Sequence, residues 1–112
     1  MRSDERAAQL WSLLILAARN QQILSYGMIE HLTGLPMRAL GKRLHPIQEY
    51  CRENGLPPLT SIAVTETSGV PGEGFTGAPI EEVFRAQARV FVFDWFNHRI
   101  PFPIAAHEEP ED

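Results

Sequence analysis

The feature that most constrains this fold is a stop signal, Gly34-Leu35-Pro36, set between two segments with helical patterning. Ser25 can cap a short helix from Tyr26 to about Thr33, and a glycine closely followed by a proline is typical of a helix C-terminus. Pro36 is favoured at the first position of a helix, which can then run through Leu44. Two helices joined by so tight a turn predict a helix-turn-helix.

The segments on either side predict further helices. From about Asp4 to Arg19, apolar residues recur every three or four positions, the pattern of an amphipathic helix: Ala7, Leu10, Trp11, Leu14, Ile15 and Ala18. On the other side, Pro46 is expected to interrupt the second helix of the motif, because a proline disfavours a helical residue before it. A separate helix is then expected from Ile47 to Asn54.

A small β element is predicted next. The segment from Leu59 to Glu66 is rich in β-branched residues and reads as a strand, and Thr67 to Phe75 is a loop dense in glycine and proline. A strand followed by such a loop would form a wing. We therefore expect a mainly α single domain with a small β wing, a winged helix-turn-helix.

The chain is expected to close with a helix and a tail. From Pro79 to Trp95 apolar residues recur at helical spacing, although Val90 to Phe93 could equally alternate as a strand, and we favour the helix. From Arg99 onward, three prolines and four acids predict an extended acidic tail over residues 99–112. The domain is accordingly expected to cover residues 1–98.

Composition limits the classes of protein that this chain can belong to. Its 112 residues suit one domain, and its single cysteine, Cys51, rules out an intramolecular disulfide. No stretch approaches the roughly 20 apolar residues of a membrane span. We expect a cytoplasmic protein with no membrane contact. The net charge of −4 argues against binding nucleic acid through bulk charge, but residues 31–52 are locally basic.

Two short segments of the motif carry a family resemblance. Tyr26-Gly27 opens the first helix and Arg38-Ala39-Leu40-Gly41 opens the second. In both, the chain resembles the winged-helix part of the alkylguanine-DNA alkyltransferase and alkyltransferase-like family, over about residues 25 to 77. The resemblance implies DNA docking by the second helix, with Arg38 matching the arginine that fills the gap left by a flipped base.

The resemblance does not extend to the family's chemistry. Its reactive Pro-Cys-His-Arg segment is replaced here by Pro58-Leu59-Thr60-Ser61, which offers no thiol nucleophile with a neighbouring base. The segment from Pro46 to Asn54 is an insertion relative to the family. Alkyl transfer is therefore not implied.

The candidate nucleic-acid-binding residues follow from spacing and from the resemblance. Arg38, Lys42 and Arg43 would project to one side of a helix, where they could meet phosphates or base edges, or simply form a solvated basic face. Tyr26 could contact a phosphate or be a half-buried core tyrosine. The wing would contribute Gly69 and Gly72, whose alternative role is to serve turns.

Other chemistry finds little support in the residues. The loop glycines lack the Gly-Lys-Ser/Thr ending of a phosphate-binding loop. None of the four histidines pairs with another or with Cys51 at metal-ligand spacing. We expect no metal, no cofactor and no enzymatic activity.

The last aromatic residues suggest a second function. Phe91, Trp95 and Phe96 belong to a set too rich for one helix face, so some should lie at the surface and contact a protein partner or a second copy, unless the first helix covers them. Two main hypotheses result, and both rank above an enzymatic one based on Cys51 or on a phosphate bound by the wing. The first is a DNA-binding module, regulatory or associated with repair or defence. The alternative is a bacterial or phage regulator or inhibitor that binds a protein through an aromatic and acidic surface.

Overall fold

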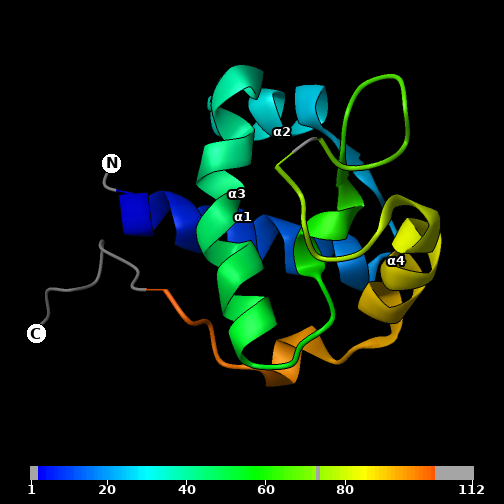
Figure 1. The fold of residues 1–112 in the computed structure, drawn as a ribbon. Coiled ribbons are helices and arrows are strands. Elements are labelled where there is room, and N and C mark those ends of the chain that lie inside the picture. Colours follow the sequence, from blue (N-terminus) through cyan, green and yellow to red (C-terminus); the bar gives the residue numbers. More distant parts are fainter. Residues whose placement is uncertain (1–2, 73, 103–112) are drawn as a thin grey trace, which may run out of the picture.

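The computed structural model describes residues 3–72 and 74–102 (Figure 1). The chain is mainly helical, with a small two-stranded sheet. Its elements are α1 (Ser3–Arg19), β1 (Leu24–Ser25), α2 (Tyr26–Thr33), α3 (Met37–Glu53), the 3-10 turn η1 (Leu59–Ile62), β2 (Ala63–Val64), the 3-10 turn η2 (Ile80–Glu82), α4 (Val83–Val92) and the 3-10 turn η3 (Trp95–Asn97).

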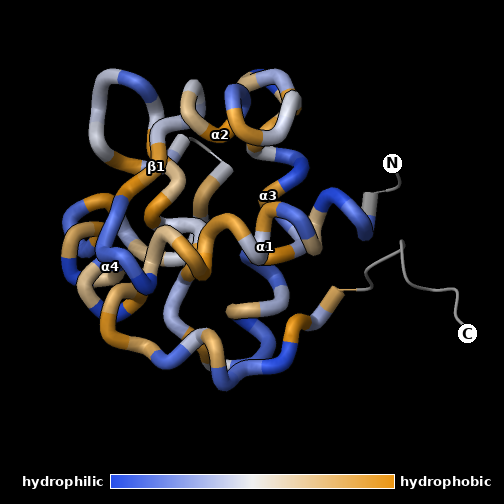
Figure 2. The backbone as a smooth tube through the Cα atoms, turned by 180° about the vertical axis from the view of Figure 1, so that it is seen from behind, coloured by the Kyte–Doolittle hydropathy of each residue, from blue (hydrophilic) through white to orange (hydrophobic). Residues whose placement is uncertain are grey.

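Helix α1 lies at the centre of the fold. Its residues Leu10, Trp11 and Leu14 are completely buried, and α3, α4, η1 and η3 all contact it. Figure 1 shows α3 crossing in front of α1, and Figure 2 shows the arrangement from behind, with α2 and α4 placed around α1. The predicted first helix is confirmed, and its apolar stripe forms the core.

Helix α3 runs without interruption through Pro46, so the predicted break at this proline is wrong. An internal proline costs about 3 kcal/mol, because it removes the amide that would bond the carbonyl four residues earlier. Leu40, Leu44 and Ile47 are buried along one side of the helix and contribute about 1.5–3 kcal/mol each. Packing of this stripe against the core therefore outweighs the local preference.

The predicted strand is largely a 3-10 turn. Residues Leu59 to Ile62 form η1, and the strand β2 that follows has two residues, which pair in parallel with β1 in the register Leu24↔Ala63 and Ser25↔Val64. All four residues of η1 are buried, whereas a half-exposed strand would alternate. The expected loop from Thr67 to Phe75 is confirmed, because its described residues belong to no helix or strand. These residues form no β-hairpin.

The C-terminal helix is confirmed, but it is shorter than predicted. It ends at Val92, and the chain then turns so that Trp95, in η3, enters the core. Ile100 and Phe102 also pack against the core, so the packed part of the chain passes beyond the expected boundary at residue 98. The rest of the expected acidic tail, residues 103–112, lies outside the described residues.

Candidate nucleic-acid interface

The turn between α2 and α3 is built as the sequence predicts. Ser25 Oγ caps α2 by accepting the Met28 N–H at 3.1 Å. Gly34 ends the helix with a φ of 79°, which glycine adopts without strain, and its N–H donates to the Glu30 carbonyl at 2.8 Å. Leu35 is buried, which fixes the direction in which α3 leaves the turn.

The first half of α3 presents a basic surface. Arg38, Lys42 and His45 are exposed and recur at spacings of four and three, so they share one side of the helix. No aspartate or glutamate occurs from residue 33 to residue 48. We call Arg38, Gly41, Lys42 and His45 the α3 basic face. Arg43 is half-buried and has an interaction within the protein, so of the three predicted cations two are free to face a partner.

Gly41 lies between Arg38 and Lys42 on this face. It is exposed inside a regular helix, its φ is ordinary, and a Cβ added to it would meet nothing within 4 Å. The helix thus carries a residue that weakens it by about 0.5–1 kcal/mol relative to alanine, with no structural reason within the fold. A glycine in this setting permits close approach of another molecule to the helix backbone.

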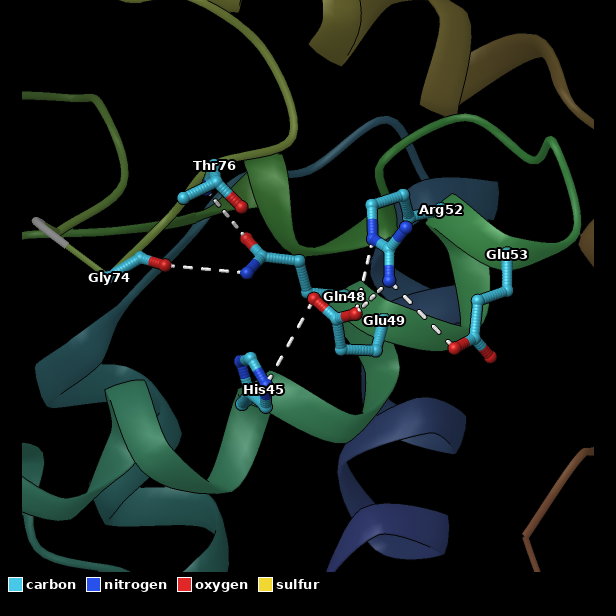
Figure 3. Close-up of polar contacts among 7 residues, drawn as sticks. All are labelled: His45, Gln48, Glu49, Arg52, Glu53, Gly74 and Thr76. Atoms are coloured by element: carbon cyan, nitrogen blue, oxygen red, sulfur yellow. Dashed lines mark hydrogen bonds and ion pairs between the residues drawn. The ribbon is translucent and has the colours of Figure 1, made fainter.

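The second half of α3 carries two acids, Glu49 and Glu53, against one base, Arg52, and Glu49 also lies 4.0 Å from His45 at the end of the α3 basic face. Glu49 is hydrogen-bonded to Arg52, with Nε to Oε1 at 3.1 Å, and Glu53 lies 3.8 Å from the same guanidinium (Figure 3). The hydrogen bond from Arg52 lowers the pKa of the Glu49 carboxyl, and the same bond raises the pKa of Arg52. Positive potential on the exposed side of α3 is therefore confined to its first half.

Gln48 ties the glycine- and proline-rich loop to α3. Its side-chain amide is buried, donates to the Gly74 carbonyl at 3.3 Å and accepts the Thr76 N–H at 2.8 Å (Figure 3). The two bonds satisfy both ends of the amide and fix this part of the loop beside the helix. The loop therefore flanks the α3 basic face at a defined position.

A small cavity lies between α3 and this loop. It has about 20 Å³ of room, enough for about one water molecule. Thr60 is buried at its edge, with no hydrogen-bond partner for its hydroxyl in the described structure. The lining residues are Tyr26, Gly41, Leu44, His45, Gln48, Thr60, Pro71, Gly74 and Phe75. In this conformation the cavity does not accommodate a nucleobase.

The predicted loop glycines have different roles. A Cβ at Gly72 would lie 3.1 Å from the Tyr26 hydroxyl, so the small residue lets the loop pass over this half-buried tyrosine. Gly69 has a φ of 72° and open space around it, which fits the turn at the tip of the loop. The structure thus brings Tyr26 and Gly72 together and leaves Gly69 apart from them.

A carboxylate occupies the N-terminus of α2. The Gly27 N–H donates to Oε2 of Glu66, which reaches back from the residues just after β2. Helix N-termini attract anions, because their backbone N–H groups are unpaired and the helix dipole is positive there. Glu66 thus fills the position at which Tyr26 and its neighbours would otherwise meet a phosphate.

The predicted aromatic interface is mostly core. Trp95 is 2% exposed and its indole N–H donates to the Val90 carbonyl at 2.8 Å, so its assignment to an exposed interface is wrong. Phe91 is half-buried against the core, and the exposed Phe96 lies under the Arg19 guanidinium, 5.1 Å from the ring centroid. Trp95 is covered because it packs edge-on against Trp11, with ring centroids 5.6 Å apart.

Metal-binding groups are not assembled in the described residues, and the single cysteine lies in the core. Cys51 is buried, and burial raises the pKa of its thiol. Within residues 3–72 and 74–102, no three side chains of His, Cys, Asp or Glu come together as a metal site would need. The same residues contain no helix that is both long and apolar enough to cross a bilayer.

Sequence reasoning missed Gly41, Gln48 and Glu66 as parts of this surface. Gly41 could have been noticed as a glycine inside a predicted helix, whereas the contacts of Gln48 and Glu66 span 28 and 39 residues and carry no local signal. Comparison with protein-family models, with curated proteins and with solved structures finds no match.

Proposed function

We propose that this chain is a non-catalytic DNA-binding module of the winged helix-turn-helix type, which docks the α3 basic face on duplex DNA. The observation that carries the proposal is the acid-free exposed half of α3, with Arg38 and Lys42 one turn apart and Gly41 between them. Lysine and arginine neutralise phosphates, and an exposed helix fits the major groove. The resemblance of Arg38-Ala39-Leu40-Gly41 to the alkyltransferase-like family supports the same helix.

The loop after β2 would act as the wing in this proposal. It is fixed beside α3 by Gln48, so a duplex lying along α3 would also meet the loop backbone near Gly72 and Gly74. The sequence of this loop contains no lysine or arginine and two acids, Glu66 and Glu73, so the proposed affinity comes from α3. Binding is therefore expected to be modest and strongly dependent on salt.

Two side chains that could act as nucleophiles near this face, Ser61 and Cys51, are buried in the described structure. Ser61, which follows Pro58 in the segment compared with the family's reactive site, is completely buried and its hydroxyl has no partner in the described structure. Cys51 faces the core from the opposite side of α3 to the basic face, and its raised pKa keeps the thiol protonated.

The proposal is tested by the salt dependence of binding to a labelled duplex of about two helical turns, measured by fluorescence anisotropy. We expect the double variant Arg38→Ala with Lys42→Ala to weaken binding and to reduce the slope of log K against log salt by about two. The matched control is Arg19→Ala with Arg99→Ala, which removes the same charge from exposed positions outside α3 and α4.

The control variant should keep the wild-type slope. Absence of binding by the wild type at low salt would refute the proposal. It would also be refuted if both double variants lowered affinity equally, because the attraction would then come from overall charge rather than from α3.

A further inference from the structure

The outer side of α4 carries a row of uncovered apolar side chains. Ile80 is 64% exposed, Phe84 67% and Val92 81%, and Ala88 is also exposed. These residues follow one another at intervals of four, so they form one ridge along α4 and the start of η2. We call these four residues the α4 ridge. Ordinary helices of small proteins keep such a row covered.

The ridge is complementary to a second copy of itself. Ala88 leaves a gap between Phe84 and Val92, and a gap of this kind accepts a large side chain from a facing helix. If two copies of α4 lie antiparallel with the midpoints of their α4 ridges together, Phe84 of each copy faces Ala88 of the other. Ile80 then faces Val92.

The charges beside the ridge favour the same antiparallel arrangement. Glu81 and Glu82 lie at the start of this segment, and Arg85 and Arg89 lie toward its end. Glu82 is bonded to Arg85 within the chain at 3.2 Å, while Glu81 and Arg89 are both exposed. Antiparallel packing brings the acidic end of one helix beside the basic end of the other, whereas parallel packing would bring like charges together.

A hollow continues the ridge at its first end. It has about 210 Å³ of room and is lined by Pro71, Gly72, Phe75, Ala78, Ile80 and Val83. In the antiparallel arrangement this end faces the end of the other copy's α4, where Val92 projects. The hollow of each copy therefore gives room for the side chains that follow Val92 in the other copy, and the two-fold symmetry repeats this contact at both ends.

The geometry points to a homodimer in which two copies of this chain pack α4 against α4, antiparallel and related by a two-fold axis. Such an interface is isologous, so every contact occurs twice. The occupant of the ridge is thus a second copy, which provides both the matching shape and the reversed charges. This inference does not depend on DNA binding, because the α4 ridge and the α3 basic face have no residue in common.

The dimer is tested by sedimentation equilibrium of the full chain from about 1 μM to about 1 mM. We expect the wild type to dimerise in this range and Ala88→Glu or Val92→Glu to raise the dissociation constant at least tenfold. Leu32→Glu is the matched control, since it places the same charge at an exposed apolar position of α2. Because all three positions are exposed, circular dichroism should show unchanged folding.

Two charge variants distinguish this arrangement from other dimers. Arg89→Glu alone and Glu81→Arg alone should each weaken self-association, because each places like charges opposite one another. A mixture of the two should form a heterodimer more tightly than either associates alone. The inference is refuted if the wild type stays monomeric throughout, if Leu32→Glu disrupts the dimer and the α4 variants do not, or if the mixture gains no affinity.

Discussion

The Thr76 N–H donates to Oε1 of Gln48 at 2.8 Å, a hydrogen bond that joins residues 28 positions apart. Through this bond, and the one from Gln48 to the Gly74 carbonyl, a single buried amide holds the loop beside α3. One side chain of α3 thus makes two hydrogen bonds that fix the neighbouring loop beside the basic helix.

Replacing Gln48 by alanine should free this part of the loop. We expect Gln48→Ala to lower the free energy of unfolding by about 1–3 kcal/mol, because the partners of a buried amide are left unpaired. Amide hydrogen exchange should show that Thr76 loses its protection. The control Gln87→Ala also removes a buried amide, which bonds the Ser61 carbonyl at 2.8 Å, and it should destabilise the protein while Thr76 stays protected. Equal protection of Thr76 in both variants would contradict the assignment.

Gly41→Ala should change stability and DNA binding in opposite directions. The added methyl group meets open space in a helix, so the free energy of unfolding should rise by about 0.5–1 kcal/mol in urea titration. On the α3 basic face the same methyl should weaken duplex binding. Gly55→Ala is the contrasting variant. Its φ of 65° is unfavourable for alanine, so it should destabilise the protein. A Gly41→Ala variant with unaltered affinity would place the DNA elsewhere.

Glu66→Gln should strengthen DNA binding while weakening α2. Loss of the negative charge removes repulsion of phosphates at the N-terminus of α2, and it also removes a favourable interaction with the helix dipole, worth about 0.5 kcal/mol. Duplex affinity at low salt and thermal unfolding report the two effects. Asp94→Asn makes the same change of net charge at an exposed position outside α3 and α4, and a gain in affinity as large as that of Glu66→Gln would show that only overall charge matters.

The Cys51 thiol should react slowly with thiol reagents in the native protein. It should also make the free energy of unfolding decrease at alkaline pH. Burial raises the pKa of the Cys51 thiol in the folded chain above its value in the unfolded chain. The thiol's contribution to the free energy of unfolding is therefore fully present below the ordinary thiol pKa of about 8.5, and it is lost as the pH rises toward the pKa of the folded state. Urea titrations should therefore show the free energy of unfolding falling above about pH 8.5. In Cys51→Ala this fall should be smaller.

Thiol reagents give an independent check on Cys51. The native protein should react at a rate limited by opening of the structure, and the urea-unfolded protein should react at once. Rapid modification of the native protein would show that the thiol is accessible.

The amino-acid sequence by itself determined the elements whose signals are local. Ser25 and Gly34 define the ends of α2, because a side-chain cap and a left-handed glycine act within one helical turn. The apolar spacing of α1 and α4 likewise predicted both helices. The basic residues of α3 were recognised from their spacing, although the half-buried Arg43 was grouped with the two exposed cations.

Only the tertiary structure decided what depends on distant partners. Pro46 remains helical because Leu44 and Ile47 are buried against the core, and Trp95 is covered because Trp11 lies in the middle of the fold. Leu59 to Ile62 form a 3-10 turn rather than a strand. The turn packs against α1, α3 and α4, which bury all four of its side chains, whereas a half-exposed strand would bury only every second one. Glu66 reaches α2, and Gln48 the loop, across chain separations that no local pattern encodes. Local preferences are worth about 1 kcal/mol per residue, and packing in the core exceeds them wherever the two disagree.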